Sequence, residues 1–344
     1  MIINVEEWAL RGCLLTLLLL GACAPLGVEQ PEPEPVKLKV VSLSYLSYAP
    51  FFIAQEEGYF AEQGLEVEFV KSGSEEAVPP LAQGQLDVLG GTISTALLNA
   101  MAQGADVRFV ADRGYIATDS CTFSGFLARR DLVEGGELES PAQLKGRRVV
   151  MEREEMASMD GYRMEKLLKI GGLTFDDTEL VDVSLPAQLD AFAKGTIDLS
   201  STSEPWISRL VNSGHAVLWM TAQEVIPDFQ MLVIVYGRTL LKDNPDAGRR
   251  FMVAYRKAVQ QHNEGKTERN LEILAEYTGL DQGLLKQACW PSFRDDGRIN
   301  VQSLLDFQNW AMEKGYLDNP ATEEQFWDPS FVEYANEVLG ASSQ

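Results

Sequence analysis

The chain has 344 residues, of which 51 are acidic and 29 are basic, and its formal net charge is −22. Such an excess of carboxylates argues against a nucleic-acid-binding protein, because that function needs basic patches. It also argues against adsorption on anionic lipid headgroups unless a covalent anchor holds the chain at the membrane.

The N-terminus has the features of an export signal. Residues 13–20 form an apolar run that is too short to span a bilayer, which takes about 20 residues. The run ends in Leu20-Gly21-Ala22-Cys23, the pattern of a bacterial lipobox. We therefore expect residues 1–22 to be a signal peptide, Cys23 to be lipidated, and residues 23–36, rich in Pro and Glu, to be an extended tether. The alternative is an uncleaved, buried hydrophobic N-terminus.

Strand-like and helix-like segments alternate through most of the remaining chain. In the first half we predict strands at 38–43, 65–70, 86–89 and 107–111, with helices starting at Pro50 and spanning 74–83 and 92–103. In the second half we predict strands at 147–151, 178–183 and 197–200, with helices at 160–169 and 186–194. This alternation is typical of an α/β protein with mostly parallel sheets.

One sequence pattern occurs in both halves. Residues 82–88 and residues 193–199 each place a Gly at the end of a helix-like segment, followed by a polar residue, an apolar residue, an Asp and a second apolar residue. Gly84 and Gly195 suit the left-handed position that ends a helix. The repeat predicts two lobes of similar design.

The predicted boundaries follow from this duplication. We expect lobe 1 to span 37–122, lobe 2 to span 123–235, and a helical segment from 236 to 344 to pack back on lobe 1. The apolar segments 121–129 and 231–236 are the expected crossings between the lobes, which would form a hinge.

Several motifs resemble one family of transport proteins. Tyr48-Ala49-Pro50-Phe51-Phe52-Ile53-Ala54-Gln55-Glu56-Glu57-Gly58-Tyr59-Phe60 resembles the opening of ABC-importer solute-binding proteins of the sulfonate/nitrate and thiamine-precursor (SsuA/THI5-like) group. Leu144-Lys145-Gly146-Arg147-Arg148-Val149 and Ser203-Glu204-Pro205-Trp206 resemble markers of that family's second lobe. The resemblance implies a two-lobed periplasmic-binding-protein fold (type II) with an interlobe ligand cleft.

The resemblance also implies partners and a location. We expect a monomer with no cofactor and no metal, lipid-anchored at the cell membrane and facing the extracytoplasmic side. A permease and an ATPase would complete the importer.

The candidate ligand-binding residues follow the carboxyl ends of the predicted strands, where loops and helix N-termini converge in open parallel sheets. They are Tyr45, Ser47, Tyr48, Gly91, Thr92, Tyr115, Glu152, Asp160, Ser203, Glu204 and Trp206.

The charges of these loops indicate the class of solute. Only Arg113 and Arg153 oppose the carboxylates of Glu152, Glu154, Glu155, Asp160 and Glu204, so the sequence disfavours an anion. Rings at Tyr45, Tyr48, Phe51, Tyr115 and Trp206 favour a planar heteroaromatic vitamin, and we expect riboflavin. A thiamine-pathway pyrimidine, an alkanesulfonate or nitrate, and a quaternary ammonium compound are the alternatives.

A different class is a THI5-like pyrimidine-synthesising enzyme. Such enzymes need an iron-binding Cys cluster and an active-site His. The two histidines here, His215 and His262, lie outside the predicted cleft loops, and the four cysteines are not clustered. We therefore expect a protein without enzymatic activity. Cys121 and Cys289 could form a disulfide in an exported chain, but nothing in their spacing demands it.

Overall fold

The computed structural model describes residues 34–151 and 154–342. Pro35–Gln344 form one compact unit. The expected signal peptide, Cys23 and most of the tether lie outside the described residues, as do Glu152 and Arg153.

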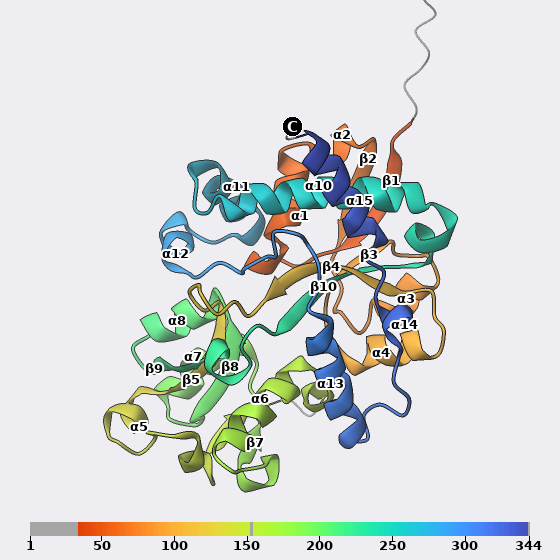
Figure 1. Ribbon diagram of the computed structural model, residues 1–344. Helices are drawn as coiled ribbons and strands as arrows, with labels where there is room; N and C mark the ends of the chain where they lie inside the picture. The colour runs from red at the N-terminus through yellow and green to blue at the C-terminus, as the bar shows by residue number, and fades with distance from the viewer. Residues whose placement is uncertain (1–33, 152–153, 343–344) are drawn as a thin grey trace, which may run out of the picture. The chain divides into compact units, whose positions relative to one another are not determined.

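Two five-stranded sheets form the framework of this unit (Figure 1). The first sheet has the order β2 (Leu65–Val70), β1 (Val36–Val41), β3 (Val88–Thr92), β10 (Gln230–Tyr236), β4 (Arg108–Tyr115). The second has the order β7 (Glu179–Val181), β6 (Arg148–Val150), β8 (Leu199–Ser203), β5 (Ser124–Arg129), β9 (Ala216–Thr221). In both sheets the first three strands are parallel, and the fourth is antiparallel to its two neighbours. The two sheets therefore share the same pattern of strand directions, although the fourth strand comes last in the chain in the first sheet and first in the second.

Helices accompany both sheets. Those of the first lobe are α1 (Ala49–Glu56), α2 (Tyr59–Glu62), α3 (Val78–Ala82) and α4 (Thr95–Ala102). Those of the second are α5 (Arg130–Glu134), α6 (Met159–Ile170), α7 (Leu185–Ala193), α8 (Trp206–Asn212) and α9 (Ala222–Val225). The C-terminal segment adds α10 (Pro245–Asn263), α11 (Glu268–Thr278), α12 (Gln282–Gln287), α13 (Val301–Glu313), α14 (Glu323–Phe326) and α15 (Ser330–Ser342).

The repeated sequence pattern makes the same contacts in both lobes. The carboxylate of Asp87 accepts the backbone N–H of Lys39 at 2.7 Å, and that of Asp198 accepts the N–H of Arg148 at 2.9 Å. Each Asp also donates its own N–H to the carbonyl of the same partner, at 3.0 and 2.9 Å. These contacts join the start of β3 to β1 in the first sheet and the start of β8 to β6 in the second. The repeated pattern therefore has the same structural role in each sheet.

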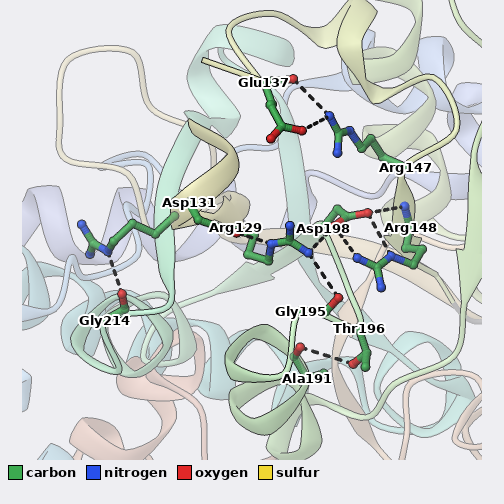
Figure 2. A network of polar contacts seen from close by, with 11 residues as sticks. Arg129, Asp131, Glu137, Arg147, Arg148, Ala191, Gly195, Thr196, Asp198 and Gly214 are labelled. Atoms are coloured by element: carbon green, nitrogen blue, oxygen red, sulfur yellow. Dashed lines mark hydrogen bonds and ion pairs between the residues drawn. The ribbon is translucent and has the colours of Figure 1, made fainter. Parts of the chain in front are cut away.

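Asp198 additionally holds two arginines, as Figure 2 shows. Arg129 approaches its Oδ1 at 3.0 Å and Arg148 at 2.7 Å, while the Asp198 side chain is only 4% exposed. Burial alone would raise the pKa of Asp198, but the hydrogen bonds and charge of Arg148 and the charge of Arg129 lower it overall. No ion pair of this kind forms at Asp87 among the described residues.

Strand β10 belongs to the first sheet. It pairs with β3 and β4, so residues 230–235 lie in the first lobe although the sequence places them in the second. All seven of its residues are buried, which is the environment that its continuous apolar run suits. The segments that cross between the lobes are therefore 116–123 and 226–229.

Two predicted helices begin later than expected. Thr92 is the last residue of β3, and Ser94 caps α4 by accepting the N–H of Leu97 at 3.4 Å. The helix predicted at 74–83 is reduced to α3, where Pro79 and Pro80 lack the N–H groups that a longer helix interior would use.

The C-terminal segment contacts both lobes. Helix α10 packs on α1, and α15 packs on β4, as expected for lobe 1. Helix α13, however, also contacts α6: Trp310 Nε1 donates to Glu165 Oε2 at 3.0 Å, and Lys314 Nζ lies 2.8 Å from the same oxygen. Cys121 and Cys289 form a disulfide, with Cα atoms 5.8 Å apart, which joins the first crossing to this segment.

His262 is a buried histidine at the end of α10. Its ring packs on Trp290 and Phe293, with centroid distances of 5.3 and 4.7 Å, and the residue is 4% exposed. Nε2 has no hydrogen-bond partner among the described residues. Burial lowers the pKa of His262 to about 4.

We expect His262→Phe to reduce acid destabilisation. The unfolded His262 binds a proton near pH 6.5 and the folded one only near pH 4, so its contribution to stability falls as the pH drops between these values. The full difference is roughly 3 kcal/mol, at about 1.4 kcal/mol per pKa unit. Denaturant unfolding from pH 7 to pH 4 measures it. Equal slopes for wild type and His262→Phe would contradict the prediction.

Candidate ligand-binding cavity

A cavity of about 290 Å³ is lined by residues of both lobes. From the first lobe, Tyr45, Ser47, Tyr48 and Thr92 line it, as the sequence predicts. From the second lobe, the predicted residues Asp160, Ser203, Glu204 and Trp206 do so. The volume is near the lower end of the range for small-molecule pockets, roughly 300 to 1,000 Å³.

Two predicted residues do not line the cavity. Tyr115 ends β4 at the hinge, where the guanidinium of Arg294 stacks 3.9 Å from its ring centroid. Gly91 contributes its carbonyl, which accepts a hydrogen bond from Arg113 at 3.1 Å, but it does not reach the cavity. Phe51, expected among the pocket aromatics, is fully buried in the core.

Tyr48 forms part of the cavity wall and is firmly held. Its hydroxyl donates to the carbonyl of Gly90 at 2.8 Å, and the side chain is almost completely buried. A Cβ atom on Gly90 would lie 2.6 Å from the Tyr48 ring, so only glycine allows this approach. Burial raises the pKa of Tyr48, although the nearby charge of Arg113 opposes this shift.

Arg113 is the buried cation of the first lobe. The residue is 2% exposed, and its guanidinium lies 4.1 Å from the Tyr48 ring centroid. It donates to the carbonyl and hydroxyl of Ser47, both at 3.1 Å, and to Gly91. Among the described residues no carboxylate lies within ion-pair distance of it, and its Nε has no hydrogen-bond partner.

Arg163 is a second buried cation, and sequence reasoning missed it. It lies in α6, is 1% exposed, and donates to the hydroxyls of Ser124 and Ser201. Asp160 pairs with it at 3.1 Å. The position of Arg163 within the helical segment 159–170 gave no signal that its side chain faces a cavity. The interpretation that only Arg113 and Arg153 supply cleft cations was therefore wrong.

The cavity carboxylates are partly engaged within the protein. Glu204 accepts the N–H and the hydroxyl of Ser208, at 3.0 and 2.9 Å, and so caps the start of α8. Burial raises the pKa of Glu204 despite these donors. Asp160 is bound to Arg163, and Glu155 also lines the cavity. The remaining wall contains Met151, Met159 and Met231, which adapt to irregular apolar shapes.

The described residues show no group of three or more His, Cys, Asp or Glu side chains that could hold a metal ion. They also contain no helix that is long and apolar enough to cross a membrane.

A family model described as "NMT1/THI5 like" matches residues 46–264, which is more than half of the chain. The chain belongs to the NMT1/THI5-like family. A relative of this NMT1/THI5-like chain is "Putative binding protein YtlA" of Bacillus subtilis, 24% identical over 318 residues and covering 90% of both chains.

Solved structures share the fold of this family member. The ligand-binding component of an ABC-type import system from Staphylococcus aureus, with zinc bound, has a TM-score of 0.70 at 17% identity and covers 87% of this chain and 99% of its own. The periplasmic nitrate-binding protein NrtA from Synechocystis has a TM-score of 0.70 at 17% identity, covering 90% and 89%. The desulfurization enzyme DSZB has a TM-score of 0.62 at 16% identity, covering 88% and 99%. The two-lobed α/β periplasmic-binding-protein fold is thus confirmed.

Proposed function

We propose that the chain is the solute-binding component of an ABC importer and that its solute is a small organic molecule with an anionic group. The fold and the family support a binding role. Arg113 is the observation that carries the choice of an anion.

The buried charge of Arg113 lacks a partner charge among the described residues. A charge removed from water costs several kcal/mol unless a partner charge and hydrogen bonds compensate it. Arg113 is buried and donates only to neutral oxygens, whereas Arg163 already has Asp160. A carboxylate, sulfonate or phosphate group of a solute would supply the missing charge, and bidentate binding suits all three. The methionines and Trp206 would contact the rest of the molecule.

Binding from both lobes provides a mechanism for delivery. A solute held first by one lobe gains further contacts when the crossings 116–123 and 226–229 bend and bring the other lobe against it. The solute then favours the closed state by its differential affinity, and the closed form docks on the permease.

Riboflavin is the second candidate. Tyr45, which is 40% exposed, and Trp206 line the cavity and offer ring faces for stacking. Fewer aromatic rings are available to stack on a solute than the sequence indicates. Tyr115 and Phe51 lie outside the cavity, and the hydroxyl of Tyr48 is hydrogen-bonded to the carbonyl of Gly90.

Calorimetric titration of the chain lacking residues 1–23 tests both candidates. We expect hexanesulfonate to bind with one-to-one stoichiometry and riboflavin not to bind. If riboflavin alone binds, the anion proposal is wrong and the importer role stands. In that case Trp206→Ala should weaken riboflavin binding at least tenfold, through loss of stacking. If neither compound binds, nitrate and a thiamine-pathway pyrimidine are titrated next. If none of these four compounds binds, the result opposes the solute-binding role.

Membrane anchoring through Cys23 is also part of the proposal. The lipobox pattern at 20–23 supports it. Cys23→Ala should release the protein from the membrane fraction, as detected by immunoblotting of fractionated cells, because a single acyl-bearing residue would supply the attachment. Retention of the variant in that fraction would oppose lipidation at this position.

We further propose binding without catalysis. Among the described residues both cysteines are bonded to each other, so neither provides a thiolate nucleophile. Prolonged incubation with the bound solute, followed by mass spectrometry, should recover the solute unchanged.

A further inference from the structure

Residues 288–293, between α12 and α13, belong to neither sheet but bring one residue, Pro291, to the cavity. Glu204 and Trp206 of the second lobe line the same cavity. We call residues 288–293 the C-terminal wall. Its position depends on contacts with two other parts of the chain, the hinge and the second lobe.

The first contact is the disulfide between Cys289 and Cys121 of the crossing 116–123. The same crossing supports the wall at Ser292, whose hydroxyl lies 3.1 Å from that of Ser120 and whose backbone bridges to Tyr115. These contacts hold the wall to the hinge.

The second lobe is held to the wall at Glu204. The backbone N–H of Cys289 donates to Glu204 Oε1 at 3.5 Å, and Glu204 in turn binds Ser208 at the start of α8. Cys289 therefore has two contacts: its sulfur is bonded to Cys121 at the hinge, and its backbone amide donates to the cavity carboxylate of Glu204.

We infer that the Cys121–Cys289 disulfide is a positioning device for the solute cavity, and that its reduction moves the C-terminal wall and lowers solute affinity. The inference rests on the proposed solute-binding function. Reduction by a dithiol breaks the S–S bond, leaves a thiol on each cysteine and converts the dithiol into its own disulfide. Cys121 is exposed to solvent, whereas Cys289 is 8% exposed, so attack is expected at Cys121.

A disulfide with only a structural role would behave differently. It spans 168 residues in sequence and would stabilise the fold chiefly by restricting the unfolded chain. Such a bond affects the unfolding transition and leaves the affinity of the folded protein unchanged. Affinity measured well below the unfolding temperature therefore separates the two roles.

The experiment compares four samples by calorimetry with hexanesulfonate at 15 °C. They are the oxidised wild type, the wild type reduced with dithiothreitol, Cys121→Ser/Cys289→Ser, and Val332→Ala. Val332 is buried in α15 and does not line the cavity, so its variant controls for lost stability alone. We expect a tenfold weaker affinity in the reduced wild type and in the double variant, with no further response of the double variant to dithiothreitol. We expect Val332→Ala to bind like the oxidised wild type. An affinity of the reduced wild type within twofold of the oxidised form would overturn the inference.

A second measurement, hydrogen exchange, does not depend on binding of hexanesulfonate. Reduction should accelerate hydrogen exchange at the Cys289 amide at least tenfold, because this N–H loses its position against Glu204. The amide of Val233, in the centre of the first sheet, should exchange at an unchanged rate. If oxidised wild type fails to bind any member of the titration panel, the proposed function fails. The exchange rate at Cys289 then decides the positioning role, and an unchanged rate would reject it.

Discussion

Replacing Arg113 with glutamine is expected to weaken binding of an anionic solute at least 100-fold, which corresponds to about 2.7 kcal/mol. Removing one partner of a desolvated, hydrogen-bonded charge pair typically costs about 2 to 5 kcal/mol. The variant should fold, because glutamine can still donate to Ser47 or Gly91 and no ion pair within the described chain is lost. Its thermal unfolding temperature should equal or exceed that of the wild type, since an uncompensated buried charge disappears.

Calorimetry with hexanesulfonate and a thermal melt together test this result. Arg256 is a matched control, because it is also a buried arginine but binds Asn336 and the carbonyl of Arg294 away from the cavity. Arg256→Gln should lower stability and leave affinity unchanged. Unchanged affinity in Arg113→Gln would remove the observation on which the anion proposal depends.

The second large effect concerns the repeated Asp. Asp198→Ala should lower the free energy of unfolding by about 3 kcal/mol, because Arg129 and Arg148 would both lose a shared, buried carboxylate. Asp87→Ala makes the equivalent change in the first lobe, where the carboxylate binds the N–H of Lys39 and no arginine. We expect a loss of about 1 kcal/mol there, the typical contribution of one hydrogen bond.

Urea unfolding of both variants at pH 7 measures the difference. Because the pKa of Asp198 is lowered in the folded state, its contribution is present above the unfolded pKa and is lost as the pH falls through the folded value. The two variants should therefore approach one another in stability at acidic pH. Equal losses at pH 7 would show that the arginines contribute nothing beyond the shared backbone contact.

The architecture was largely predictable because its signals are local. Gly84 and Gly195 adopt φ of 72° and 64°, as residues that end helices, and the Asp after each begins the approach to a strand. Hydrophobic alternation then placed most strands within a few residues. The lobe boundary at 235 was less predictable, because an apolar run such as 231–236 indicates burial but not which sheet receives it.

The cavity was predictable only in part, and for a physical reason. Loops at strand ends converge, so Tyr45, Ser47, Ser203 and Trp206 could be placed there. Arg163 lies within a helix, where periodicity does not distinguish a side chain facing a cavity from one facing solvent. Pro291 reaches the cavity through contacts between segments far apart in sequence, which no local pattern reports.

The return of β10 to the first sheet determines how this chain can be divided and assembled. Strand β10 completes the first sheet only after the whole second lobe has been synthesised, whereas all five strands of the second sheet lie within residues 124–221. An N-terminal fragment ending before residue 230 would expose the edges of β3 and β4, which are aggregation-prone templates. The first lobe is therefore not an autonomous folding unit, and the late closure of the long-range pairs of β10 with β3 and β4 predicts slow folding of that lobe.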